Sequence, residues 1–484
     1  MKKITNFIIL LLFVQSWISK TDTEFLDFKT FTKQELSEDL NILETALREA
    51  HPGLYLYTDS TDLADSFKHL KSELENATDV FTFSTQLFKV LNQVHCGHIE
   101  VSWPESEVGK FFSSTKFFPD PIVIINDNVF INNPPDSKSS LTFGDQILSI
   151  NGVDINKILN SIEAFVPGDG TSGTNKYRQI EDYFYLYLAF EFPERDHFSV
   201  EILSNDTGQK ITQDVQLKGH DETIEKYEAR IKRYETDKNF SFEVLSDSVG
   251  LITIRSFDAR YRNDAAIDSV FHNIRSQGIK SVILDLRGNR GGSRGYKEYL
   301  ASYFIDEATT LTSATEINEP TYSFLEYTAD SVDSNFYTFA DKHTANEQGK
   351  YIQTVTDKII PKPNAYTGQL AVLVDGYCFS ACSSFASFLY DHNGNSVFIG
   401  EETIGGFKGH TGGYYTEVTL PNSHLRIKIP LVKFTENVSS FSWGRGLVPH
   451  HNIESQLEDL VNGNDAPLNV AVEIVGRQKG KAKN

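Results

Sequence analysis

The chain has 484 residues, a hydrophobic fraction of 39% and a formal net charge of −21. A chain of this length exceeds what one hydrophobic core supports, so we expect about two to four domains. With 12% aromatic residues, it is expected to be ordered over most of its length. The acidic balance argues against a nucleic-acid-binding protein, which needs clustered Lys and Arg, and against adsorption to anionic membranes.

Residues 1–19 predict an export signal. Lys2 and Lys3 precede the apolar run Phe7–Val14, which is typical of a secretory signal peptide and too short to span a bilayer. Ser16–Ser19 is an imperfect cleavage site, so an uncleaved anchor is the alternative. No later stretch is long and apolar enough to cross a membrane. We therefore expect a periplasmic or secreted protein that is soluble once the signal is removed.

Residues 20–110 predict a helical N-terminal domain. Thr32 and Glu35 form a capping box, and the leucines that follow repeat at the spacing of one helix face. Further helical patterns cover 60–76 and 82–94. This domain carries the histidines considered below as catalytic bases.

Residues 111–218 predict a β-rich module of short strands, among them 121–125 and 129–131. Leu141–Gly152, with the sequence LTFGDQILSING, resembles the PDZ-domain pattern of a glycine–aspartate pair before an Ile-Leu-x-Ile-Asn-Gly strand and turn. The resemblance implies a groove that binds an extended peptide or a chain end. A structural spacer is the alternative.

Residues 219–460 predict an α/β core with a mainly parallel sheet. Apolar strands at 249–254, 281–286, 370–374 and 397–399 alternate with helical segments near 263–277, 293–305 and 380–391. The polar segment at about 320–365 has few apolar runs and is interpreted as a lid or a partner surface. Residues 461–484 are expected to form a C-terminal helix and tail.

Ser380 is the candidate nucleophile. It follows the strand Leu370–Val374 and the turn Asp375–Gly376, and it opens the helical segment that begins with Ala381. The unpaired N–H groups at a helix N-terminus lie where an oxyanion would form. The alternative is a serine that simply caps its helix.

The loop Asp285–Gly292, with the sequence DLRGNRGG, follows a buried strand and ends in paired glycines. Glycines after a strand let the backbone approach a ligand closely and direct N–H groups at it. A phosphate-binding loop is disfavoured because neither GxxxxGK[ST] nor GxGxxG is present. We expect an oxyanion hole formed by the N–H of Gly291 or Gly292 together with the N–H of Ala381.

Three motifs in order resemble the C-terminal processing (tail-specific) peptidases and their tricorn-like relatives. They are the DLR-x-N-x-GG loop at Asp285–Gly292, the pair Ser380–Ala381, and the GE-x-T-x-G element at Gly400–Gly405. The resemblance also covers 91–101 and 420–449. It implies a crotonase-like core and a serine peptidase that needs no metal and no organic cofactor.

The catalytic base implied by the resemblance is His98. In the processing branch a lysine serves as base, but its position falls on Gly406, and Lys408 lies two residues too late. The tricorn-like branch uses a histidine that matches His98. A histidine can take the serine proton and return it to the leaving amine near neutral pH. A structural histidine is the alternative, and His95 is a competitor.

The tricorn-like branch also has a late glutamate that orients the histidine. Glu436 lies in about the right region, and Glu401 and Glu402 are rivals. The family's GV-x-PD ending here reads Leu447–His450, so histidine replaces the usual aspartate. Without an orienting carboxylate the histidine can hold the wrong tautomer.

The three cysteines do not form a disulfide framework. Cys378 and Cys382 flank Ser380, and Cys96 lies two residues from His98. The interpretations are one disulfide that ties the base segment to the nucleophile turn, or buried small residues. A zinc site of the three cysteines with a histidine is a further alternative, supported by no CxxC or HExxH motif.

The sequence therefore predicts an exported serine peptidase that hydrolyses peptide bonds of a peptide or protein substrate. The first alternative is a non-catalytic peptide- or lipid-binding protein on the same scaffold, since the resembled family includes retinoid-binding relatives. The second is an esterase or amidase that uses the same acyl chemistry. The presence of Ser380, His98 and both loop glycines favours catalysis.

Overall fold

The computed structural model describes residues 28–134, 137–171, 173–193, 195–231, 239–246, 248–328, 332, 334–439 and 443–476. The predicted signal peptide and the end of the predicted tail lie outside these residues. None of the helices in the described part combines the length and the apolar character that crossing a membrane requires.

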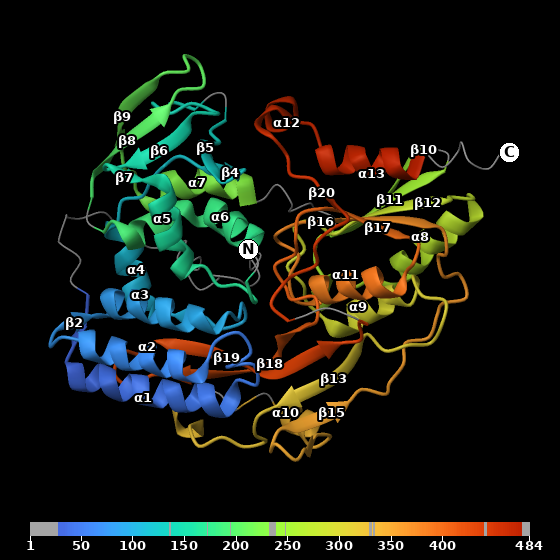
Figure 1. Ribbon diagram of the computed structural model, residues 1–484, viewed down its shortest axis with the longest axis horizontal. Coiled ribbons are helices and arrows are strands. Elements are labelled where there is room, and N and C mark those ends of the chain that lie inside the picture. Colours follow the sequence, from blue (N-terminus) through green and yellow to red (C-terminus); the bar gives the residue numbers. More distant parts are fainter. Residues whose placement is uncertain are drawn as a thin grey trace.

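The secondary structure comprises helices and strands in alternation along the chain (Figure 1). The helices are α1 (Lys33–Ala50), α2 (Ser60–Glu73), α3 (Val80–Leu91), α4 (Glu105–Ser114), α5 (Ile155–Ile162), α6 (Thr174–Glu191), α7 (His220–Ile231), α8 (Asp264–Ser276), α9 (Arg294–Ala301), α10 (Ser334–Ala340), α11 (Ala381–His392), α12 (Leu457–Asn462) and α13 (Ala466–Gly476). The strands are β1 (Thr30–Phe31), β2 (Thr78–Asp79), β3 (Glu100–Ser102), β4 (Ile122–Ile125), β5 (Asn128–Ile131), β6 (Gln146–Ile150), β7 (Val153–Asp154), β8 (His197–Leu203), β9 (Lys210–Gln216), β10 (Phe240–Ser246), β11 (Val249–Ile254), β12 (Ser281–Asp285), β13 (Thr312–Ile317), β14 (Thr344–Ala345), β15 (Tyr351–Thr354), β16 (Gln369–Val374), β17 (Ser396–Gly400), β18 (Gly409–Thr419), β19 (Arg426–Glu436) and β20 (His451–Asn452).

The core sheet has the order β10-β11-β12-β16-β17-β20, and it is parallel from β11 onward. Val282 and Leu284 on β12 join one apolar cluster with side chains of α8, α9 and α11. Ile283, between them, joins a second cluster with α13 on the opposite face. Because successive side chains of a strand point to opposite faces, apolar runs bury both sides of the sheet. The predicted parallel α/β core is confirmed.

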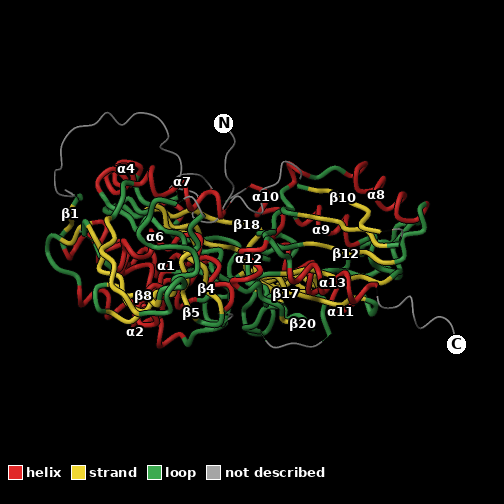
Figure 2. Tube along the Cα trace, turned by 90° about the horizontal axis from the view of Figure 1, so that it is seen from above, coloured by secondary structure: helices red, strands yellow, loops and turns green. Residues whose placement is uncertain are grey.

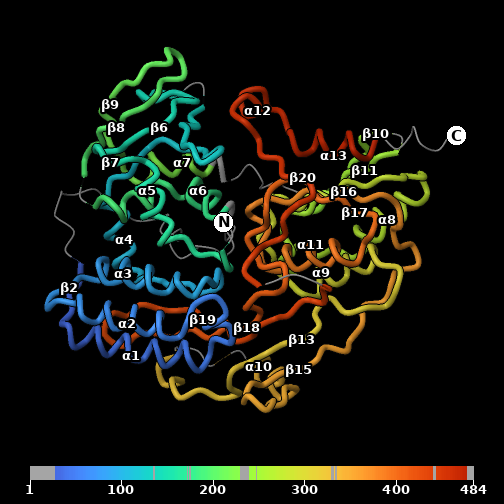
Figure 3. Tube along the Cα trace, in the orientation of Figure 1, coloured from blue at the N-terminus to red at the C-terminus, as the bar shows by residue number. Residues whose placement is uncertain are grey.

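A second sheet has the order β14-β15-β13-β19-β18, with β3 paired to β19. β3 belongs to the N-terminal half and begins two residues after His98, whereas β18 and β19 lie between the core strands β17 and β20 in the sequence. In Figure 3 β18 and β19 lie beside the N-terminal helices. The predicted lid segment, 320–365, contributes α10, the edge strand β14 and its neighbour β15 to this region.

The capping box predicted at Thr32 and Glu35 opens α1 as expected. The α1 helix then buries Asp39, whose carboxylate accepts the backbone N–H groups of Asn422 and Ser423 at 3.0 and 2.8 Å. These two residues lie in the turn between β18 and β19. A buried, doubly hydrogen-bonded carboxylate therefore fixes the N-terminal helices to the second sheet.

The third sheet has the order β4-β5-β6-β8-β9, with β7 paired to β6, and all its pairings are antiparallel. The LTFGDQILSING segment forms β6 and the turn that follows it. Asp145 accepts the backbone N–H of Thr142 at 2.8 Å, which closes the turn before β6. Figure 2 shows this module and the N-terminal helices in one half of the molecule and the core sheet in the other. The assignment of the module as PDZ-like stays a prediction.

Candidate active site

Ser380 occupies a strained turn between β16 and α11. Its backbone has φ 52° and ψ −119°, a conformation that favours glycine, and its side chain makes no capping hydrogen bond to the helix. The interpretation as an ordinary helix cap therefore has no support. Such a conformation costs about 1–3 kcal/mol and clusters at functional sites, where neighbouring structure maintains it.

The cysteines around the turn pair with each other. Cys378 and Cys382 form a disulfide that brackets Ser380, and Cys96 is a buried free thiol. The expected disulfide between the base segment and the nucleophile turn is wrong, because both bonded cysteines belong to the turn. The zinc site of three cysteines is wrong for the same reason, since the disulfide occupies two of its thiols.

Of the paired glycines of the DLRGNRGG loop, Gly291 lies against Ser380 and Gly292 lies against the backbone of Phe257. A Cβ on Gly291 would come within 2.9 Å of both Ser380 Cβ and the Ala381 nitrogen, and one on Gly292 would lie 2.3 Å from the carbonyl carbon of Phe257. Both positions have positive φ. The backbone can therefore approach the nucleophile this closely only as glycine.

One of the two predicted oxyanion donors is already used. The Gly291 N–H donates to Asn289 Oδ1 at 2.9 Å, and the Phe379 N–H donates to the Asn289 carbonyl at 3.2 Å. Asn289 thus joins the glycine loop to the nucleophile turn. This geometry favours the N–H of Gly292 over that of Gly291 as the partner of the Ala381 N–H.

His98 lies directly beside the nucleophile turn. Its ring stacks on the ring of Phe379, the residue before Ser380, with centroids 4.3 Å apart, and the residue is 4% exposed. Burial, with His410, Lys428 and His51 nearby, holds the pKa of His98 well below its ordinary value. His98 is therefore neutral at pH 7, the form in which an imidazole accepts a proton.

Glu436 lies at the centre of a buried polar cluster, not against His98. Its carboxylate accepts a hydrogen bond from Ser384 Oγ at 2.5 Å and from Thr312 Oγ1 at 3.2 Å, and it pairs with Lys297 Nζ at 3.6 Å. His410 Nδ1 lies 3.8 Å from the same carboxylate. Burial raises the pKa of Glu436, but Lys297 and His410 outweigh it, so the net shift is downward and the group is ionised.

The cluster touches both members of the predicted catalytic pair. Ser384 lies one helical turn after Ser380, and its N–H donates to the Ser380 carbonyl at 3.0 Å. Lys297 also donates to Ser384 Oγ. The His410 ring is 5.7 Å from the His98 ring. No motif in the sequence indicated Lys297, Ser384 or His410, because they come together only through the packing of α9, α11 and β18.

Glu401 and Glu402, the rivals of Glu436, each pair with an arginine. Glu401 makes two hydrogen bonds with Arg178 of α6, at 2.9 and 2.8 Å, and Glu402 makes two with Arg445, at 2.8 and 2.6 Å. His450, which replaces the family's aspartate, accepts the Phe398 N–H through Nδ1 at 3.0 Å. These three residues stabilise the structure around the site, and Glu401 joins the core to the β-rich module.

A lysine base has no place in this site. A Cβ on Gly406 would lie 2.5 Å from the Gly409 carbonyl oxygen, so this loop accommodates no side chain there. The Nζ of Lys408 donates to the Val438 carbonyl at 3.1 Å. His95, the competitor of His98, ends a short 3-10 helix in a left-handed conformation with φ 52°.

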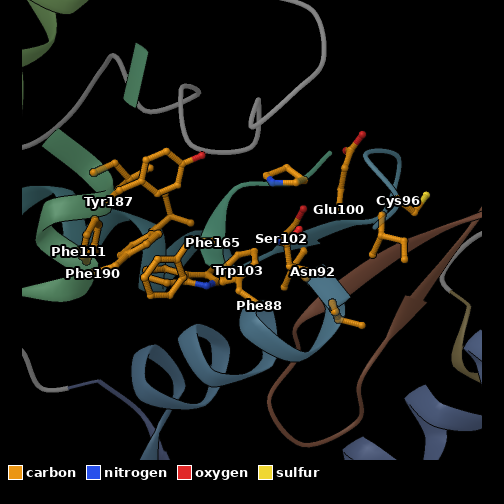
Figure 4. A pocket seen from close by; sticks show the side chains of 16 residues that line it. Phe88, Asn92, Cys96, Glu100, Ser102, Trp103, Phe111, Phe165, Tyr187 and Phe190 are labelled. Carbon is orange, nitrogen blue, oxygen red and sulfur yellow. The ribbon is translucent and has the colours of Figure 1, made fainter. Parts of the chain in front are cut away.

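A large apolar cavity extends from the base segment into the N-terminal half, with a volume of about 110 Å³ (Figure 4). Cys96 and Glu100 line one end, and Phe111, Tyr187 and Phe190 line the other. Its walls come from α3, β3, α4 and α6. Predominantly apolar walls with few polar groups are typical of sites for apolar ligands or side chains.

Comparison with known proteins finds a family model that matches the region of the core sheet. The profile of "Peptidase family S41" matches residues 248–453. A "Probable CtpA-like serine protease" of Staphylococcus saprophyticus is 22% identical over 257 residues, which are 53% of this chain and 43% of that protein. This chain thus aligns with less than half of that relative's length.

Solved structures share the fold over nearly the whole chain. The crystal structure of mature CPAF is 15% identical, has a TM-score of 0.64, and covers 92% of this chain and 96% of its own. Mature CPAF complexed with lactacystin is 14% identical with a TM-score of 0.62 and covers 92% and 98%. At these identities the likeness shows the fold, and it extends beyond the core to the N-terminal half.

Proposed function

Because residues 248–453 match the profile of peptidase family S41, we propose that this chain is a serine peptidase in which Ser380 is the nucleophile and His98 the general base. The observation that carries the proposal is the strained Ser380 turn, held between the paired glycines and the ring of Phe379 on which His98 stacks. A histidine beside a serine in a Gly-favoured conformation has no evident structural need.

In the first step His98 takes the Ser380 hydroxyl proton while Oγ attacks the carbonyl carbon of the scissile peptide bond. The N–H groups of Gly292 and Ala381 stabilise the oxyanion, each worth about 3–4 kcal/mol in comparable sites. His98 then returns the proton to the leaving amine. A water activated by His98 hydrolyses the acyl-enzyme in the same way.

In this proposal Glu436 supports the base His98 indirectly, through His410. Its ionised carboxylate lies 3.8 Å from His410 Nδ1, and the His410 ring lies along the His98 ring. A buried negative charge favours the positive charge that develops on a nearby imidazole as it accepts a proton. We therefore assign Glu436 as an electrostatic and positioning residue.

The apolar cavity provides a binding place for substrate. Its end at Cys96 and Glu100 lies next to the segment that carries His98. We assign it to a large apolar side chain close to the scissile bond, while the β-rich module binds the extended peptide or its chain end. An exported location, periplasmic or secreted, fits the predicted signal peptide in residues 1–19.

Labelling with a fluorophosphonate probe tests the proposal, because the probe reacts only with an activated serine. We expect the folded wild type to label, and Ser380→Ala and His98→Gln to lose labelling at least a hundredfold. His272→Gln, which changes an exposed histidine on α8, is the matched control and should label like wild type. A folded wild type that does not label, with or without peptides, would favour the binding-protein alternative.

A further inference from the structure

Three metal-ligating side chains lie together beside the proposed base. One ligand atom from each of Cys96, His98 and Asp169 falls within 4.8 Å of the other two, and the residues are 7%, 4% and 4% exposed. The Gly97 N–H donates to Asp169 Oδ1 at 2.8 Å, which fixes the carboxylate against the base segment. The group is thus preformed and buried.

The second carboxylate oxygen of Asp169 has no hydrogen-bond partner, although it is buried. Asp169, Cys96 and His51 line a small cavity of about 10 Å³. The Gly53 N–H donates to His51 Nδ1 at 3.2 Å, so the imidazole proton is on Nε2, which also has no partner. Buried polar groups are almost always satisfied, and this space holds about one water. The two unsatisfied atoms therefore indicate a small polar occupant.

We propose that Cys96, His98 and Asp169 bind one Zn²⁺ or a similar divalent ion, with a water in the small cavity as fourth ligand, and that the bound ion switches the peptidase off. Thiolate, imidazole and carboxylate are the ligands that zinc prefers. The thiolate and the carboxylate together balance the two positive charges of the ion, which matters in a buried site. Binding releases the thiol proton of Cys96 to solvent.

The geometry requires only a modest adjustment. Zinc holds sulfur at about 2.3 Å and nitrogen or oxygen at about 2.0–2.2 Å, so ligand atoms in a tetrahedral site lie about 3.3–3.7 Å apart. Atoms that lie within 4.8 Å of one another therefore need to close by at most about 1.5 Å. Cys96 lines both the large apolar cavity and the small one.

The switch itself rests on the proposed function. A metal on either ring nitrogen of His98 lowers the basicity of the imidazole, and on the nitrogen that faces Ser380 it also blocks proton transfer. The ion therefore competes with catalysis without displacing the nucleophile. This differs from the three-cysteine zinc site, because Cys378 and Cys382 take no part.

Cobalt binding tests the site without reference to activity. The protein is kept oxidised, so that Cys96 is the one thiol, and Co²⁺ is added to the metal-free chain. We expect about one Co²⁺ per chain with a thiolate charge-transfer band in the near ultraviolet. The Cys96 thiol forms a hydrogen bond with Thr411 Oγ1 at 3.0 Å. Cys96→Ser, which keeps a hydroxyl for this bond, should lose the band. Asp169→Asn, which keeps the acceptor for Gly97, should weaken binding at least tenfold.

His451→Gln is the control for adventitious binding, because it removes an exposed histidine next to His450, and it should keep the band. Absence of the band in wild type, or its persistence in Cys96→Ser, would overturn the site. A band that His451→Gln abolishes would assign the metal to the surface and overturn it as well.

Fluorophosphonate labelling with and without Zn²⁺ tests the switch, and each variant serves as its own reference. We expect saturating Zn²⁺ to slow wild-type labelling at least tenfold, a chelator to restore it, and Cys96→Ser to show no slowing. Equal slowing in Cys96→Ser would overturn the switch. A metal-free protein that never labels but shows the cobalt band would overturn the peptidase and its switch while establishing the site.

Discussion

The rings of His98 and His410 stack with their centroids 5.7 Å apart and their planes 25° from parallel. His410 lies on β18, which also places it 3.8 Å from the carboxylate of Glu436. The proposed base thus lies beside a second buried imidazole, and that imidazole lies beside a buried carboxylate. The contacts thus run from Phe379 in the nucleophile turn through His98 and His410 to the buried Glu436.

Replacement of Glu436 separates its structural from its catalytic contribution. Glu436→Gln removes the negative charge that pairs with the buried Lys297. We therefore expect a loss of about 3–5 kcal/mol in the free energy of unfolding. Lys297→Met combined with Glu436→Gln should recover most of this stability. Urea unfolding measures the first effect, and fluorophosphonate labelling of the double variant measures the second.

The recovered double variant should still label several-fold more slowly than wild type, because it lacks the negative charge beside His410. Lys297→Met with Glu436 intact is the matched control for loss of the lysine alone. If the double variant is stable and labels at the wild-type rate, Glu436 is a purely structural residue.

The conformation of Ser380 predicts a gain of stability on its removal. Ser380→Gly should be more stable than wild type by about 1 kcal/mol or more, because glycine adopts φ 52° and ψ −119° without the strain of a side chain. Ser380→Ala keeps a Cβ and should show little change. Thermal and urea unfolding of the two inactive variants give the comparison, and equal stability would show that the turn stores no strain.

Buried histidines predict acid sensitivity. Burial lowers the pKa of His51 to about 3 and that of His410 to about 4, from ordinary values near 6.5. At these two histidines the unfolded chain therefore binds more protons than the folded one below pH 6.5. Each of them should lower the free energy of unfolding by up to about 1.4 kcal/mol per pH unit as the pH drops from 6.5 toward 4. Asp169 and Asp375, whose pKa values burial raises to about 7 and about 6, act in the opposite direction.

Urea unfolding at several pH values between 7.5 and 4.5 measures this slope. His51→Gln should lower stability at pH 7.5 but reduce the slope by about one proton's contribution. His272→Gln, at an exposed position, should leave the slope unchanged. An identical slope in wild type and His51→Gln would show that His51 does not contribute to the pH dependence of stability.

Filling the large apolar cavity should change substrate choice. Val108 lines the cavity from α4 and is 3% exposed. Val108→Phe occupies part of the space, so cleavage of peptides with a large apolar residue should fall at least tenfold in kcat/KM relative to peptides with a small one. The ratio of the two kcat/KM values is the measurement. An unchanged ratio would place the substrate side chain elsewhere.

The core could be predicted from the sequence because its signals are local. The apolar runs that became β11, β12, β16 and β17 match the expected ranges to within one residue at every end, and the Ser380–Ala381 helix start is exact. Each buried parallel strand carries its own hydrophobic signature. The glycine loop was identified for the same reason, since its spacing lies within eight residues.

The surroundings of the base could not be predicted in this way. Asp169, His410 and Lys297 are single polar residues with no local pattern, and only tertiary packing brings them near His98 or Glu436. The disulfide was assigned to the wrong partner because proximity of three cysteines does not fix their pairing. The segment 320–365 also carries more regular structure than its few apolar runs indicated, since β15 gains its stability from pairing with β13.

The pairing of β3 with β19 has a consequence for the chain during its synthesis. His98 enters the site only when the strand after it finds a partner that is made near the end of the chain. A nascent or truncated chain can form the N-terminal helices and even the serine turn, yet it holds no assembled proton acceptor. In the proposed mechanism, a chain that ends before β19 therefore lacks the assembled pair of His98 and Ser380.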